Sequence, residues 1–230
     1  FLALVRVSQI CFRAGLADFY ASILFVTGAL SLVIAAAFML GQSNIKRAFA
    51  YSSIEHMGIL VLGLGLGGVG LFGALFHMIT NALAKAVMFL TAGSIAQKYG
   101  SSRVEDVRGV IQTYPMTGIF LILALFAGTG MFPFATFHSE LLILNAAVMS
   151  RHYVLTGIFI ACLIVIFIGL ARIVLGAVYG APTEPVLPKK ENFFMNSAIA
   201  VSAVGLIALG LWMPPFLERV LNEAAAMVGG

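Results

Sequence analysis

The chain contains a membrane-length apolar stretch, Leu71–Lys98, that carries polar side chains near its centre. His77, Asn81 and Lys85 stand at every fourth position, so on a helix of 3.6 residues per turn they lie on one face. Lys85 is about 18 Å from either end of the stretch, beyond comfortable reach of the headgroups. A lysine held near the middle of a bilayer costs about 3 kcal/mol or more and normally marks an ion or proton path. We therefore expect this helix to carry protons.

The composition places the whole chain in a membrane. Of its 230 residues, 61% are hydrophobic and 10% are charged, and the mean hydropathy is +1.07. A water-soluble domain of this size needs more polar surface than this composition supplies. Lys and Arg stand singly or in pairs in the loops, which gives no support for nucleic-acid binding. Cys11 and Cys162 have neither metal-ligand nor disulfide spacing, and we expect no metal site and no cofactor.

The apolar runs predict an all-α, polytopic bundle of about six membrane spans in one membrane domain, residues 1–230. The expected spans are 19–40, 45–66, 71–98, 115–150, 153–179 and 193–213. Asn44 is well placed to cap the second of these helices. Residues 1–17 lack an initiator Met and are typical of the tail of a preceding helix, so we expect a longer parent chain. A short amphipathic segment, Phe216–Val228, is expected at the membrane interface.

The segment 115–150 is interrupted by a Gly/Pro cluster that includes Gly128, Gly130 and Pro133. Such a cluster breaks the helical hydrogen-bond ladder, and non-helical backbone at membrane depth requires partners from protein or water. The composition leaves two interpretations open, two ordinary spans with a tight turn or one discontinuous helix. Glu140 follows the cluster, and an unpaired carboxylate at that depth can hold or release a proton. His138 is a weaker candidate on the same segment.

Further ionisable residues lie on the other predicted spans. Glu55 and His56 stand in the first half of the second span, where they form either a local polar pair or part of a proton path. Lys46 opens that span beside Arg47, and a Lys-Arg pair at a helix mouth is usually a topological anchor. Arg172 lies in the last two turns of its span and is a weaker candidate, with a structural role as the alternative.

The distribution of positive charge predicts the orientation. With six crossings, one side carries Lys46, Arg47, Lys98, Arg103, Arg108, Lys189 and Lys190, and the other carries Arg6, Arg13, Arg151 and Arg219. By the positive-inside rule the first side is cytoplasmic, which places the C-terminus outside. A polar loop with Pro182, Pro185 and Pro188 precedes the last span.

Two runs carry a family resemblance, NIKRAFAYSSIEHMG at Asn44–Gly58 and FHMITNALAK at Phe76–Lys85. They resemble the antiporter-like subunits shared by respiratory complex I, Mrp cation/proton antiporters and membrane-bound nickel–iron hydrogenases. Within this superfamily the SSIEHMG motif is most similar to hydrogenase-4 component F. The similarity extends from about Phe1 to Met213.

The resemblance implies a fold of fourteen helices built on two inverted five-helix repeats, each with one discontinuous helix and a buried ionisable residue near its break. This chain would cover the second repeat and the final helix, which favours the broken helix and places Glu140 at the break. Lys46, His77 and Lys85 would belong to the family's hydrophilic axis. Asn81 departs from the pattern because several relatives carry a second histidine there, so one relay step would depend on water or on the amide.

The function implied is that of a proton-translocating subunit of a hydrogenase or complex I-like redox complex in a bacterial or archaeal cytoplasmic membrane. Other membrane subunits would be its partners and would hold the redox centres, since the chain offers no iron–sulfur ligands and no dinucleotide loop. It would not be catalytic alone. The alternatives are a Na+/H+ antiporter subunit without a redox partner and a structural membrane scaffold. A haem held by His56 and His77 is a minor further hypothesis.

Overall fold

The fold is described by a computed structural model that covers residues 1–182 and 190–229. Pro185, Pro188 and Lys189 of the predicted polar loop lie outside the described residues. The described residues form these helices: α1 (Leu2–Arg13), α2 (Ala17–Leu40), α3 (Ile45–Leu66), α4 (Gly68–Tyr99), α5 (Val110–Thr113), α6 (Pro115–Gly128), α7 (Ala135–Met149), α8 (Tyr153–Tyr179), α9 (Phe193–Leu211) and α10 (Pro215–Gly229). Within these residues there is no β-strand, only an isolated bridge between Asn44 and Arg103. The predicted all-α class is confirmed.

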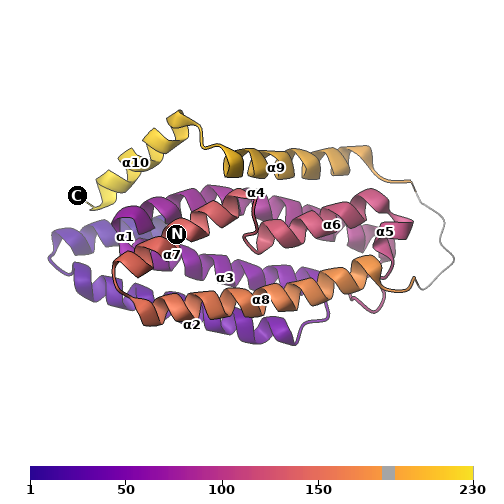
Figure 1. Cartoon of the computed structure of the whole chain (residues 1–230), viewed down its shortest axis with the longest axis horizontal. Helices are drawn as coiled ribbons and strands as arrows, with labels where there is room; N and C mark the ends of the chain where they lie inside the picture. The colour runs from indigo at the N-terminus through magenta and orange to yellow at the C-terminus, as the bar shows by residue number, and fades with distance from the viewer. Residues whose placement is uncertain (183–189, 230) are drawn as a thin grey trace.

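Five of the helices, α2, α3, α4, α8 and α9, are long and apolar enough to cross a membrane. The apolar helices α6 and α7 have 14 and 15 residues, or about 21 and 22 Å each, which is less than the roughly 30 Å of a bilayer core. They follow one another along the bundle in Figure 1 and are joined by residues 129–134. Their lengths and order agree with the predicted discontinuous span, and the predicted polytopic helix bundle is confirmed.

The helix starts follow local chemistry. The Asn44 side chain accepts a hydrogen bond from the Arg47 backbone N–H, as expected of an N-cap, and fixes the start of α3. Gly67 has φ +65°, a conformation that favours glycine, and it lets α4 begin at Gly68 rather than at the expected Leu71. At the same end as Asn44, the Ile45 N–H donates to the carbonyl of Ser102 at 2.9 Å, which ties the start of α3 to the segment after α4.

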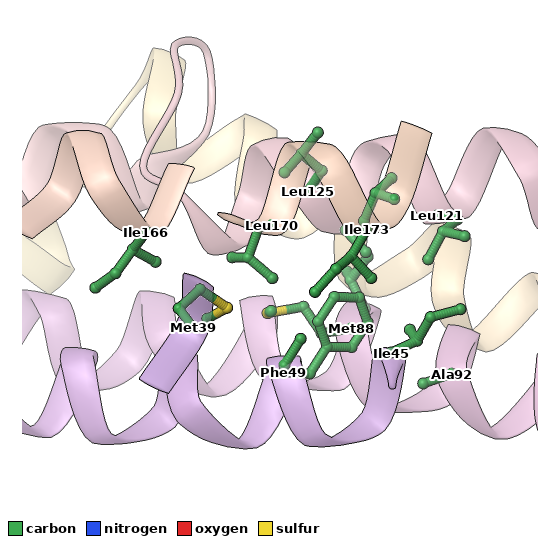
Figure 2. Packing of buried hydrophobic residues seen from close by; sticks show 14 of the residues in the cluster. Met39, Ile45, Phe49, Met88, Ala92, Leu121, Leu125, Ile166, Leu170 and Ile173 are labelled. Atoms are coloured by element: carbon green, nitrogen blue, oxygen red, sulfur yellow. The ribbon is translucent and has the colours of Figure 1, made fainter. Parts of the chain in front are cut away.

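Apolar side chains from most of the helices fill the interior. Figure 2 shows Ile166, Leu170 and Ile173 of α8 facing side chains on α2, α3 and α4. The residues that face them include Met39 and Phe49, and both have no exposed surface. Lipid is as apolar as leucine, so this contact stabilises the bundle through close van der Waals packing rather than through removal of water.

Small residues allow a close contact between α2 and α3. A Cβ added to Gly28 of α2 would lie 3.0 Å from the carbonyl oxygen of Gly58 on α3, and a Cβ on Gly58 would lie 2.9 Å from that of Gly28. Small residues at a crossing point let two backbones approach, as is common between membrane helices. This contact holds α3, which carries several of the buried polar residues, against its neighbour.

The last two helices cover one side of the bundle. In Figure 1, α9 and α8 lie on opposite sides of α4 and α6. A Cβ on Gly210 of α9 would lie 2.7 Å from the backbone nitrogen of Ala135. Helix α9 is therefore in close contact with the break between α6 and α7. The amphipathic helix α10 buries Leu221 and exposes Phe216 and Met227. Its position at the membrane interface stays a prediction.

Candidate functional site

The break between α6 and α7 leaves backbone carbonyl groups that have no helical partner, and side chains supply the missing bonds. The hydroxyl of Thr136, in the first turn of α7, donates to the Ala127 carbonyl at 2.9 Å. His56, on α3, brings its Nε2 atom to 3.2 Å from the Gly128 carbonyl. The break thus meets the requirement that backbone polar groups at membrane depth find partners within the protein. It also anchors a histidine beside the free end of a helix.

Two fully buried histidines are in direct contact. The Nδ1 atom of His56 lies 3.0 Å from the Nε2 atom of His77. Because the Gly128 carbonyl can only accept, His56 Nε2 carries a hydrogen, and in the neutral ring Nδ1 is then the acceptor. His77 Nε2 is therefore the donor of the bond between the rings. The two ring nitrogens are bonded to each other in this structure, and the hypothesis of a haem held by these histidines stays a prediction.

Ser139, on α7, continues the chain of hydrogen bonds beyond His77. Its hydroxyl oxygen lies 2.8 Å from His77 Nδ1 and 2.9 Å from the carbonyl oxygen of Thr136. A neutral His77 needs Ser139 to donate to Nδ1. A His77 with a second proton donates to Ser139 instead, whose hydroxyl hydrogen then turns to the Thr136 carbonyl. The network can therefore take up or release one proton through the rotation of one hydroxyl group.

Glu140 lies next to this network. Its carboxylate oxygen Oε1 is 3.8 Å from His56 Nδ1 and has no hydrogen-bond partner among the described residues. The residue is only 6% exposed. Gly130, in the break, has φ +57°, and a Cβ there would overlap the carboxylate. Glycine at this position therefore both permits the turn and gives the acid its place.

Lys85, on α4, forms a second polar group with Ser52 of α3. These are the helices that also carry His77 and His56. The Lys85 ammonium donates to the Ser52 hydroxyl at 2.6 Å and lies 3.8 Å from the sulfur of Met88, so the amine is bonded inside the bundle rather than extended to the headgroups. Ser52 and His56 are one helical turn apart on α3, which sets the two polar groups side by side.

Further buried oxygens accompany the two groups. The atoms without a hydrogen-bond partner in the described part of the chain include Oε2 of Glu55 and Oδ1 of Asn81. Both residues are almost fully buried, at 1% and 6% exposure. Buried polar atoms are normally satisfied by protein or by ordered water.

Three of the candidates lie apart from these groups. Lys46 is exposed at the start of α3. Arg172 is exposed on α8 and donates to the Leu40 carbonyl at 2.6 Å, so it caps the end of α2. His138 is half-buried, and its ring makes a T-shaped contact with the ring of Phe76. The structure brings together Lys85, His77, Glu140 and His56, with Glu55 and Asn81 buried nearby, but not these three.

Ser139 and Thr136 are part of the network although their positions in the sequence gave no reason to select them. A hydroxyl residue between His138 and Glu140 was the only available signal, and its partner His77 is on another helix.

Glu191 is a second residue that the sequence did not single out. Its carboxylate accepts hydrogen bonds from the Met116 and Thr117 backbone N–H groups at 2.8 and 3.2 Å, and from Lys98 at 2.9 Å. Thr117 and Asn196 also donate to it from their side chains. Burial favours a higher pKa for Glu191, but these hydrogen bonds and the charge of Lys98 outweigh it and hold the pKa below its usual value. Glu191 thereby joins the end of α4 to the beginnings of α6 and α9.

Comparison with known proteins identifies the family. The family model described as "NADH:quinone oxidoreductase/Mrp antiporter, TM" matches residues 1–166. The chain belongs to this family. Among curated members of the NADH:quinone oxidoreductase/Mrp antiporter family, the hydrogenase-4 component F homolog of Methylacidiphilum infernorum (isolate V4) is 31% identical over 218 residues. That alignment covers 90% of this chain and 43% of the relative, so the chain spans less than half of that protein.

Solved structures share this fold. A chain of the Mrp complex from Dietzia sp. DQ12-45-1b superposes with a TM-score of 0.90 at 19% identity, covering 99% of this chain and 50% of that one. A chain of the membrane-bound sulfane sulfur reductase, an archaeal respiratory membrane complex, gives a TM-score of 0.87 at 23% identity. That superposition covers 98% of this chain and 46% of that one. The predicted family of antiporter-like membrane subunits is confirmed.

Proposed function

We propose that the chain is part of a proton-translocating membrane subunit of a hydrogenase or complex I-like redox complex. The observation that carries this proposal is the unbroken set of hydrogen bonds from the Gly128 carbonyl through His56 and His77 to Ser139, at the break of a discontinuous helix. Broken helices and buried ionisable residues are the usual components of ion paths within membranes. The bond between Lys85 and Ser52 starts one helical turn away on α3.

Protons would pass between Lys85, the two histidines and Glu140. Histidine carries protons near neutral pH because one ring nitrogen can accept while the other donates. The unpartnered oxygens of Glu55, Asn81 and Glu140 support a hydrated connection between the two polar groups, since such atoms bind ordered water. A charge moved in a neighbouring subunit would shift the proton affinities of these residues strongly, because the surrounding dielectric is low.

The setting of the subunit belongs to the same proposal. Its partners would be other membrane subunits, which would hold the redox centres, and the membrane would be the cytoplasmic membrane of a bacterium or archaeon. Lys46 and Arg103 would face the cytoplasm and the C-terminus the outside. Lys46 would act at the mouth of the path rather than in the buried groups, while Arg172 and His138 have structural contacts that compete with such a role.

A cation/proton antiporter subunit is the second candidate, because the matching family model covers Mrp antiporters. Such a subunit would exchange sodium for protons without any redox partner. A structural scaffold is the third candidate, and it requires the buried charges to be silent.

Reconstitution of the complete complex in vesicles, with a pH-sensitive dye inside, tests the proposal. Glu140→Gln removes the ionisable group but keeps the shape of the side chain. We expect it to reduce proton translocation strongly, while the complex still binds its redox substrates. Glu223→Gln, at an exposed position of α10, is the matched control and should pump normally. Full pumping by Glu140→Gln would favour the scaffold. Transport that requires sodium and runs without a redox substrate would favour the antiporter.

A further inference from the structure

We propose that His56, His77 and Glu140 form a binding site for a divalent transition-metal ion of the zinc class, in which the ion takes the place of the proton shared by the two histidines. The ligand atoms of these three residues all lie within 4.8 Å of one another. They come from three different helices, α3, α4 and α7, and all three residues are buried.

The distances fit a zinc ion after a small movement. Zinc binds histidine nitrogen at about 2.0–2.1 Å, and two nitrogens at tetrahedral angles around it are then about 3.4 Å apart. His56 Nδ1 and His77 Nε2 are 3.0 Å apart, so the rings need to separate by only a few tenths of an ångström. Glu140 Oε1, at 3.8 Å from His56 Nδ1, is a buried ligand atom without a hydrogen-bond partner in the described chain. Two histidines and a carboxylate with an open fourth position are a known zinc ligand set.

The outer hydrogen bonds of both histidines already have the pattern that metal ligands require. A ligating histidine usually donates its other ring N–H to a carbonyl or similar acceptor, which fixes the tautomer. His56 Nε2 has the Gly128 carbonyl for this purpose, and His77 Nδ1 has the Ser139 hydroxyl. Without a metal, His77 Nδ1 and the Thr136 carbonyl both need the single hydroxyl hydrogen of Ser139. With a metal between the rings, Ser139 accepts from His77 and donates to the Thr136 carbonyl at 2.9 Å, so both contacts are satisfied.

A pocket lies beside the carboxylate of Glu140. It has a volume of about 130 Å³ and is lined by Glu140, Gly130, Phe137, Leu141 and Phe159, among others. Phe137 and Leu141, on the same helix as Glu140, are 38% and 48% exposed, so the pocket borders the outer face of the bundle. The pocket therefore leaves space beside the carboxylate.

The consequence for function rests on the proposed proton path. An ion on His56 Nδ1 and His77 Nε2 occupies the two lone pairs between which the proton would move. Zinc bound at this site would therefore stop proton transfer without touching any redox centre.

Metal binding is measured on the purified complete complex by titration with Co2+, followed by its visible absorption, and then by displacement with Zn2+. We expect one Co2+ per copy of the chain at this site, with the absorption of a four-coordinate nitrogen and oxygen site. His77→Gln should abolish the absorption, and Ser139→Ala should weaken Co2+ binding by roughly 10–100-fold. His152→Gln, which changes an exposed histidine before α8, is the matched control and should bind Co2+ normally.

The outcomes separate the metal site from the proton path. Binding that survives His77→Gln, or no stoichiometric Co2+ absorption in the unaltered complex, would overturn the inference. Should His77→Gln fail to assemble, the Ser139→Ala and Glu140→Gln affinities decide in its place. Binding by the unaltered complex without any block of proton transport would uphold the site and contradict the proposed path instead.

Discussion

Gly130 lies directly beside the carboxylate of Glu140, so close that a Cβ at residue 130 would overlap the side-chain oxygens. The backbone of Gly130 has φ +57°, which only glycine adopts without strain. A turn in the middle of a membrane helix and the position of a buried acid therefore depend on the same residue.

Gly130→Ala should accordingly damage both stability and transport. The left-handed backbone costs an alanine about 1–2 kcal/mol, and the methyl group displaces Glu140. We expect a lower thermal unfolding temperature of the detergent-purified complex and reduced proton translocation. Gly157→Ala, in helix α8 where an added Cβ meets nothing within 4 Å, is the control. It should be neutral or more stable by about 0.5–1 kcal/mol, and equal behaviour of the two variants would contradict the account of the break.

Gly210→Ala tests whether α9 supports the break from outside. The added methyl group would meet the backbone of Phe134 and Ala135, and overpacking of this kind costs about 1–3 kcal/mol. Gly205→Ala changes the same helix, where the nearest atom to an added Cβ is a Leu83 methyl at 3.9 Å. Thermal unfolding should separate the two variants clearly. If they unfold at the same temperature, α9 does not constrain the break.

Glu191 predicts a dependence of stability on acid pH. Hydrogen bonds from Thr117, Lys98 and Asn196 overcome the effect of burial and lower its pKa in the folded protein. The unfolded chain then binds more protons over this range, so the stabilisation is complete above the unfolded pKa of about 4.3 and is lost as the pH falls through the folded pKa. Unfolding temperatures measured from about pH 7 to about pH 3 should fall less steeply for Glu191→Gln than for the unaltered protein. Glu223→Gln should follow the unaltered protein, and parallel curves for all three would refute this role of Glu191.

Substitution of Asn81 distinguishes a hydrated proton path from a dry, packed interior. Its Oδ1 atom is buried without a partner in the described residues. Asn81→Leu removes that water-binding atom at similar volume, and we expect proton translocation to fall while the yield of assembled complex is kept. Asn81→His restores polar atoms and should pump. Normal transport by the leucine variant would show that no proton step depends on this position.

Much of the fold follows from patterns that are local in the sequence. Uninterrupted apolar runs predicted the spans, and Asn44 marked a helix start because its side chain can bond the N–H three residues on. The face shared by His77 and Lys85 follows from helical spacing alone. The composition left open whether residues 115–150 form two ordinary spans or one broken helix, and α6 and α7, each shorter than a bilayer core, favour the broken helix.

The contacts that make the site could not be read in the same way, because they join residues far apart along the chain. Ser139 is 62 positions from His77, and Gly128 is 72 from His56, so spacing gives no indication of either bond. The metal-ligand pattern of His56, His77 and Glu140 was equally hidden, since no two of them lie on one helix. Glu191 stands outside the helices, and only the packing of α4, α6 and α9 gives it partners.

Proton uptake by the reconstituted complex with Lys85→Arg tests the central claim most directly. Arginine keeps the positive charge and can still donate to Ser52, but it does not release its proton in proteins. If Lys85 carries protons, the variant assembles with normal yield and its proton uptake falls to the level of empty vesicles. If Lys85 only places a fixed charge in the bundle, the variant pumps like the unaltered complex, and the proposed path is wrong.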